Sequence, residues 1–103
     1  MNERDEGKGV SHRPEQTYQA EILSRIKYVV LGNKRSYHFG ARVTTDDRSF
    51  RTSIRLKTEP EPDINAKIVE GASVLITGVE YVVTKKNGRV HRINATRLEF
   101  PNP

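Results

Sequence analysis

The chain has 103 residues, of which 34% are hydrophobic and 30% are charged, and its net charge at pH 7 is +5. This length suits one domain with a modest core, and no apolar run approaches the ~18 residues of a membrane-spanning helix. Cysteine is absent, which excludes disulfides and thiolate metal sites. The first nine residues are polar and lack the apolar stretch of a secretory signal. We therefore expect a cytoplasmic protein.

Positive charge is concentrated in two segments of the chain. Residues 18–57 carry nine Lys and Arg against three Asp and Glu, and residues 71–103 carry five against two. The connector between them, residues 58–70, has a net charge of −3. A fold that brings the two basic segments together would present one positive face to a polyanion. The alternative is basic charge scattered over a solvated surface.

Residues 1–16 contain glycine, proline and mixed charge with almost nothing apolar, and we expect a flexible N-terminal arm. Residues 17–103 then form the domain. Alternation of apolar and polar residues predicts a first strand over residues 17–30. Its apolar side comprises Tyr18, Ala20, Ile22, Ile26, Tyr28 and Val30. Leu23 and Ser24 interrupt the alternation, which predicts a strand bent by a bulge.

Two further strands follow across short turns. Residues 32–36 have the composition of a turn, and residues 37–44 alternate with Tyr37, Phe39 and Val43 on the apolar side. After a second turn at residues 46–48, residues 49–57 form the clearest half-buried strand. Phe50 belongs to its apolar side, so we expect Tyr37, Phe39 and Phe50 in the core.

The connector breaks the strand pattern. Pro60 and Pro62 cannot donate to a central ladder, and Asp63 is suited to cap a short helix over residues 64–69. A fourth strand is expected over residues 73–84 and a fifth over residues 90–100. Asn87 and Gly88 between them form a strong hairpin signal.

The predicted fold class is all-β. Three strands, a helical or irregular connector and two more strands follow the chain order of the OB-fold, a five-stranded Greek-key barrel. A small split sandwich or an SH3-like barrel is the structural alternative, because short half-apolar strands must pack against each other in some closed or layered form.

The segment around the fourth strand resembles a known family. Gly71 and Gly78 bracket a stretch of the form G-x-x-V-x-V-x-G, and a basic Asn-Gly hairpin and an alternating final strand follow. This resembles the C-terminal half of bacterial single-stranded DNA-binding proteins and of PriB-type primosomal proteins, over about residues 70–100. Gly71 suits the positive φ of a turn, and Gly78 suits a strand bend at a barrel corner.

The chain also departs from that family. Ser24 stands where the family places a glycine, tryptophan is absent, and residues 99–103 lack an acidic tip. The resemblance therefore favours a primosomal, plasmid or phage relative, and leaves recruitment of repair enzymes without support.

An OB-fold holds its ligand across strands two and three, between the loop joining strands one and two and the loop joining strands four and five. Basic residues occupy all three places in this sequence, and long cationic side chains neutralise phosphates and release counterions. The candidate nucleic-acid-binding residues are Lys34, Arg35, His38, Arg42, Arg51, Arg55, Lys57, Tyr81, Lys85, Lys86 and Arg89.

Unpaired bases also require flat surfaces on which to stack. Tyr81 is expected to be exposed beside the basic hairpin, and His38 shares the face of Arg42. His91 is a further candidate. The guanidinium planes of the strand arginines offer stacking in place of tryptophan.

Nothing in the sequence predicts an enzyme, a metal site or a cofactor. The three histidines lack carboxylate neighbours at metal-ligand spacing, and nucleotide-binding and hydrolase motifs are absent. The preferred hypothesis is a sequence-tolerant single-stranded DNA-binding protein that protects or presents DNA in replication or recombination. The alternatives are an RNA-binding OB-fold protein and a replication adaptor whose basic face docks an acidic protein. A homodimer is favoured, because one small barrel contacts only a short stretch of strand.

Overall fold

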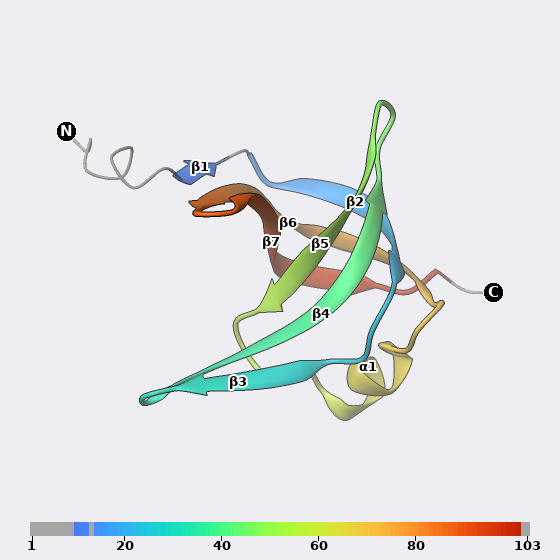
Figure 1. The fold of residues 1–103 in the computed structure, drawn as a ribbon. Helices are drawn as coiled ribbons and strands as arrows, with labels where there is room; N and C mark the ends of the chain where they lie inside the picture. Colours follow the sequence, from blue (N-terminus) through green and yellow to red (C-terminus); the bar gives the residue numbers. More distant parts are fainter. Residues whose placement is uncertain (1–9, 13, 102–103) are drawn as a thin grey trace.

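The computed structural model describes residues 10–12 and 14–101. Within them the chain forms one short helix and otherwise strands (Figure 1). The elements are β1 (Val10–His12), β2 (Gln16–Ile22), β3 (Lys27–Leu31), β4 (Lys34–Thr44), β5 (Ser49–Leu56), α1 (Pro62–Lys67), β6 (Ser73–Lys85) and β7 (Gly88–Glu99).

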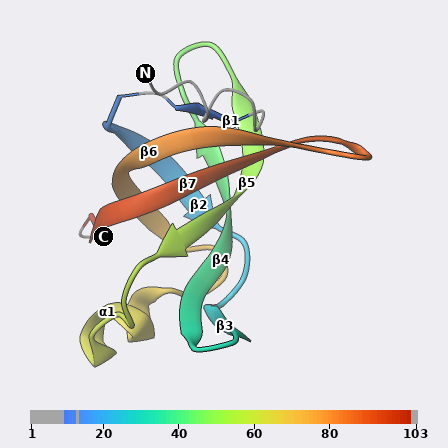
Figure 2. The same cartoon turned by 90° about the vertical axis from the view of Figure 1, so that its left-hand side faces the viewer.

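Five of the strands close a ring. Strand β2 pairs with β4 and β6, β4 pairs with β5, β5 pairs with β7, and β7 pairs with β6. Only the β5–β7 pairing is parallel, so the C-terminal strand crosses over to close the barrel (Figure 2). Strand β1 adds to β6, and β3 adds to β4. The predicted all-β, five-stranded OB-fold barrel is therefore confirmed, with two short strands attached to it.

The barrel interior is filled by alternate residues of the ring strands. Strand β4 shows the pattern clearly, because Phe39, Ala41 and Val43 are buried while the residues between them are half-buried. Tyr37 and Phe50 are partly buried and pack against this core. The prediction that these aromatic side chains serve the core is confirmed.

The predicted first strand is divided in two. Ile22 pairs with Ala41 and Lys27 pairs with His38. The five residue steps from Ile22 to Lys27 therefore lie opposite only three residue steps of β4. The two extra residues are accommodated at the predicted bulge, where Gly40 N–H donates to Ser24 Oγ at 2.9 Å. The predicted interruption at Leu23 and Ser24 is confirmed, and the insertion is large enough to divide the predicted strand into β2 and β3.

The end of the predicted strand does not reach the core, although Ile26 still packs against it. Tyr28 and Val30 are 63% and 53% exposed. The hairpin made by β3 and the start of β4 extends beyond the barrel, as the lower left of Figure 1 shows. The apolar side of β3 therefore continues the inner face of the sheet where no core lies beneath it.

The helix in the connector starts earlier than predicted. Pro62 occupies the first turn and Glu61 is the N-cap, without a side-chain capping bond. Asp63 lies inside the first turn, so its predicted role as the cap was wrong. The fixed φ of proline suits the first helical position, which explains the earlier start. Ile68, just after the helix, is 1% exposed and anchors the connector to the core.

Both glycines of the motif occupy positions that require glycine. Gly71 has a φ of +90°. A Cβ at Gly78 would collide with the Asn94 carbonyl oxygen and lie 2.9 Å from Ala95 Cα. The β6–β7 register shifts between Thr77 and Gly78, so the predicted barrel corner is confirmed.

Part of the predicted N-terminal arm is described. Val10–His12 pairs with the outer segment of β6, where Val10 lies opposite Val83, and Gln16 begins β2. The sequence pattern did not predict this short strand, and residues 1–9 and 13 lie outside the described part. No helix among the described residues has the length and apolar character needed to cross a membrane.

Candidate nucleic-acid interface

The outer face of β4 and β5 carries four of the predicted side chains in adjacent pairs. His38 lies opposite Arg55, and Arg42 lies opposite Arg51. Gly40 and Ser53 form the pair between them. Because paired residues of a sheet project to the same side, these six residues form one band, which we call the outer strip. Sequence alternation alone placed its four predicted members correctly on one face.

The outer strip continues onto β7 and β6. Arg92 lies opposite Ser53 on one side and opposite Tyr81 on the other. The predicted residue Tyr81 is therefore adjacent to the strip, although it is half-buried rather than exposed. Arg92 was absent from the predicted site. The alternation of Arg92 with the apolar residue Ile93 could have predicted that Arg92 faces outward. Its position beside β5, however, depends on the parallel β5–β7 pairing.

A surface depression links the strip to the β6–β7 hairpin. Its volume is about 450 Å³, and Gly40, Arg51, Ser53, Arg89 and Val90 contribute to its lining. Glycine and serine have small side chains, so they leave room between the longer cations at the rim. The depression brings together Arg51 from the first basic segment and Arg89 from the second, which are 38 positions apart in the chain.

The two basic hairpins project to the same side of the barrel, above and below β5 in Figure 1. Lys85, Lys86 and Arg89 line the tip of the β6–β7 hairpin. On the other hairpin, Lys34 shares the side of the sheet that carries His38. Arg35 projects to the opposite side, and its guanidinium lies 6.0 Å from the centre of the Tyr28 ring. Arg35 is thus separated from the outer strip.

Lys57 is likewise separated from the strip. It follows the last residue of β5 and lines a depression of about 400 Å³ between β7 and the connector. Arg97 and Ile64 contribute to the same depression. The structure therefore gathers nine of the eleven predicted residues along the strip and its flanking hairpins, while Arg35 and Lys57 face other surfaces.

His38 is the flat, polar member of the strip. Its Nε2 lies 2.8 Å from Ser36 Oγ. Partial burial lowers the pKa of His38 below its usual value of 6.5, and the positive charges of Arg55 and Arg92 lower it further. The imidazole is therefore uncharged at neutral pH. An uncharged ring between cations is suited to stack on a base rather than to pair with a phosphate.

An acidic residue borders the strip on the β2 side. Glu21 lies opposite Arg42 in the β2–β4 ladder, and its Oε1 is 3.5 Å from Arg42 Nη1. The two side chains are 50% and 42% exposed, so their attraction is weak in water. It nevertheless competes with any phosphate for the same guanidinium.

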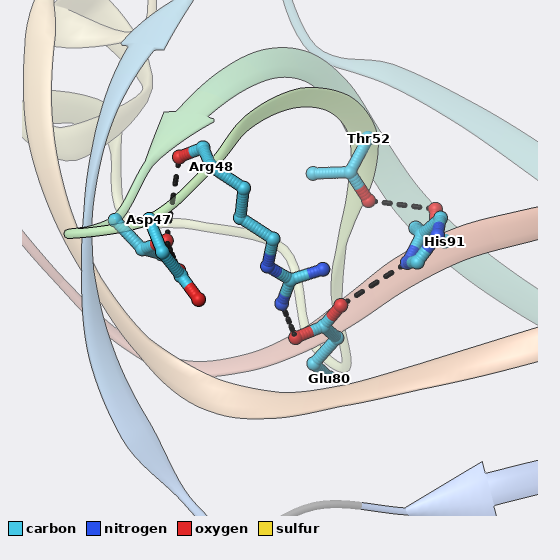
Figure 3. A network of polar contacts seen from close by, with 6 residues as sticks. Asp47, Arg48, Thr52, Glu80 and His91 are labelled. Atoms are coloured by element: carbon cyan, nitrogen blue, oxygen red, sulfur yellow. Dashed lines mark hydrogen bonds and ion pairs between the residues drawn. The ribbon is translucent and has the colours of Figure 1, made fainter.

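His91 also lines the depression shared by Arg51 and Arg89, but its ring is held by a polar network. Its Nδ1 is 3.1 Å from Glu80 Oε2, and Glu80 is 1% exposed. Arg48 Nη2 reaches the other carboxylate oxygen at 2.8 Å, and Thr52 Oγ1 donates to the His91 carbonyl at 2.6 Å (Figure 3). The His91 ring also packs 5.4 Å from Phe50. His91 thus joins a polar network at the end of the barrel instead of offering a free stacking surface.

The described residues contain no group of three or more His, Asp or Glu side chains placed to hold a metal ion. The chemistry of the strip is that of cations, small side chains and one uncharged imidazole. Such a surface provides charge neutralisation and stacking for a flexible polyanion.

Comparison with known proteins finds the same fold in solved structures. The small single-stranded DNA-binding protein of Streptomyces coelicolor superposes with a TM-score of 0.67 at 15% identity, over 85% of this chain and 92% of that one. The second single-stranded DNA-binding protein of Mycobacterium smegmatis gives 0.60 at 16% identity, over 84% and 86%. The yeast mitochondrial single-stranded DNA-binding protein Rim1 gives 0.59 at 16% identity, over 84% and 93%.

No protein-family model and no curated protein sequence matches the chain. The similarity is therefore one of structure. It establishes that this barrel shares the OB-fold arrangement of the single-stranded DNA-binding proteins.

Proposed function

We propose that this protein binds single-stranded DNA along the outer strip, with little dependence on sequence and without chemistry on the strand. The observation that carries the proposal is the depression shared by Arg51 and Arg89, because it joins the two basic segments on one surface. Cations on both sides of a floor of small residues suit an unpaired strand, whose phosphates and bases are both accessible.

Affinity would come mainly from phosphate neutralisation. Arg51 and Arg55 are exposed on β5, and the hairpin residues Lys85, Lys86 and Arg89 are exposed at one end of the strip. Each phosphate contact releases condensed counterions and contributes about 0.7 to the slope of log K against log salt for a single strand. Phosphate contacts do not read base edges, so this contribution to the affinity is independent of the DNA sequence.

Stacking would supply the preference for unpaired over paired strands. His38 presents an uncharged ring within the strip, and Arg92 and Arg55 present guanidinium planes beside it. Bases of a duplex are already stacked on each other and cannot use these surfaces. Base–aromatic stacking contributes roughly 1–3 kcal/mol per base, which is sufficient to discriminate between the two forms of DNA.

DNA is favoured over RNA because the three structural neighbours are each described as single-stranded DNA-binding proteins. We place the protein among proteins that protect or present DNA in replication or recombination, with a PriB-type primosomal role as the specific form. Residues 17–103 would form the binding domain, with residues 1–16 as an arm beside it, and the working unit would be a homodimer.

The test is a fluorescence-anisotropy titration of single- and double-stranded oligonucleotides at several salt concentrations. We expect Arg51→Glu combined with Arg55→Glu to weaken single-strand binding by at least about tenfold and to lower the salt slope. The matched control combines Lys67→Glu with Arg97→Glu, which makes the same charge change outside the strip.

Three outcomes would contradict the proposal: a wild-type salt slope near zero, equal affinity for both DNA forms, or equal loss in the two double variants. Competition between poly-dT and poly-U of equal length separates DNA from RNA binding. An adaptor for an acidic protein would show no retention on either polymer at low salt.

A further inference from the structure

The turn of the β6–β7 hairpin contains an asparagine that is followed by a glycine. Lys86 and Asn87 form the turn, and Lys85 pairs with Gly88 as the last pair of the ladder. The backbone nitrogen of the residue after an asparagine can attack the side-chain amide and release ammonia. Gly88 has no Cβ to crowd that approach. Asn87 is therefore followed by the residue that hinders this reaction least.

The structure leaves Asn87 free to react. Asn87 and Gly88 are exposed, and a Cβ built at Gly88 would meet no atom within 4 Å apart from its chain neighbours. In the described part of the chain, no hydrogen bond or ion pair restrains the Asn87 side chain. The hairpin also extends away from the barrel, as the right side of Figure 2 shows. Opening the turn frays only the end of one ladder, which costs little free energy.

Cations surround this turn. Lys85, Lys86 and Arg89 line a depression of about 440 Å³ together with Asn87 and Gly88. Nearby positive charge favours the negatively charged form of a group, so these cations assist the loss of a proton from the Gly88 nitrogen. The same three cations belong to the DNA-binding surface proposed above. A new negative charge at Asn87 would therefore lie inside that surface.

We propose that Asn87 is a site of spontaneous deamidation, and that the product weakens the binding of single-stranded DNA by this hairpin. The Gly88 nitrogen gives up its proton and bonds to Asn87 Cγ, while the Cγ–Nδ2 bond breaks and Nδ2 leaves as ammonia. Water then adds to either carbonyl of the resulting cyclic imide and opens it. The products are aspartate and isoaspartate. The co-reactant is water, and nothing is oxidised or reduced.

The product changes the hairpin tip in two ways. Deamidation replaces a neutral amide with a carboxylate, so the net charge of residues 85–89 falls from +3 to +2. Isoaspartate also carries the backbone through the side-chain carbon, which lengthens the turn and disturbs the pairing of Lys85 with Gly88. We expect single-strand affinity to fall by about two- to fivefold at low salt, and by less at high salt. This second part of the inference rests on the proposed function.

The β3–β4 hairpin supplies an internal control. Asn33 is also exposed in a two-residue turn with basic neighbours, but lysine follows it, and the lysine side chain hinders the attack. After incubation in mildly alkaline buffer, mass spectrometry of proteolytic peptides measures the conversion of each asparagine. Asn87 should convert at least about tenfold faster than Asn33, and its product should include isoaspartate.

Equal rates at the two asparagines, or an Asn87 that stays intact, would overturn the proposed site. A product that contains aspartate alone would overturn the imide route, because direct hydrolysis of the side-chain amide forms no isoaspartate. These measurements are made without DNA, so they do not depend on the proposed function.

The effect on binding is measured with variants of Asn87. Asn87→Asp carries the new charge, and Asn87→Gln is the matched control, since it keeps a neutral amide whose cyclisation requires a larger ring. In anisotropy titrations at low salt, Asn87→Asp should bind single-stranded DNA about two- to fivefold more weakly than Asn87→Gln. Aged wild-type protein should lose affinity in proportion to the fraction of Asn87 converted, whereas aged Asn87→Gln should bind as its fresh preparation does.

Equal affinity of Asn87→Asp and Asn87→Gln would refute the effect on binding. Fresh wild-type protein that binds no single-stranded DNA would instead refute the proposed function. The comparison of rates at Asn87 and Asn33 would still decide whether Asn87 is a deamidation site.

Discussion

Arg48 and Glu80 meet in an ion pair of 2.8 Å, although one lies in the turn between β4 and β5 and the other in β6. Glu80 is 1% exposed and also contacts His91 of β7. The Arg48 guanidinium lies 4.3 Å from the centre of the Phe50 ring, which holds it over the carboxylate. The network thus ties three segments of the barrel together at one end (Figure 3).

Breaking this pair from the arginine side should destabilise the fold. Arg48→Met keeps the length of the side chain and leaves the buried carboxylate with its remaining partners, and removal of one member of a buried pair costs roughly 3–5 kcal/mol. Because Arg48 is 34% exposed, we expect the lower part of that range. Urea unfolding measures the change.

The double variant Arg48→Met with Glu80→Gln is the control for that experiment. Its loss in free energy of unfolding should be smaller than the sum of the losses in the two single variants. The reason is that no buried carboxylate is left without its arginine when both side chains are replaced. Strict additivity would show that the two side chains are not coupled.

Removing the acidic neighbour of Arg42 should strengthen binding. Glu21→Gln releases the guanidinium from a contact of 3.5 Å and removes a negative charge from the border of the strip. We expect affinity for single-stranded DNA to rise by about two- to fivefold at low salt, with the gain shrinking as salt screens the charge. Glu59→Gln makes the same charge change in the exposed connector and should gain less. An equal gain at Glu59 would show that net charge alone is responsible.

The lowered pKa of His38 makes stability depend on pH in a defined direction. Burial, with Arg55 and Arg92, lowers the folded-state pKa below the unfolded value of 6.5. Below pH 6.5 the unfolded chain therefore takes up a proton that the folded protein does not bind. This contribution to stability is complete above pH 6.5 and declines as the pH falls toward the folded-state pKa.

The measurement compares urea unfolding of the wild type and His38→Gln between pH 7.5 and pH 5.5. The wild type should lose more stability over this interval than the variant does. Parallel curves would show that His38 does not carry the pH dependence.

Alternation in the sequence was sufficient to predict the ring strands and the face of the barrel on which the four strip residues lie. It was insufficient for Tyr28 and Val30, because a local pattern shows which side of a strand is apolar but not where the strand leaves the core. To place Arg92 in the site, one must know that β5 and β7 are neighbours. Their pairing is parallel and joins segments that are distant in the sequence, so a local pattern does not predict it.

The buried network was missed for a related reason. Glu80 falls in a strand rich in apolar residues, where a single carboxylate resembles an outward-facing position. Its partner Arg48 lies 32 positions earlier, within a segment that reads only as a turn. Local patterns cannot pair two such residues, since the closure of the barrel is what brings them together.

The parallel contact between β5 and β7 has a consequence for biosynthesis. Until residues 88–99 leave the ribosome, β5 and β6 each lack a neighbour, and the ring cannot close. Arg89 and Arg92 are delivered by that same last strand. A growing polypeptide would therefore acquire its complete cationic surface only after β7 has been synthesised.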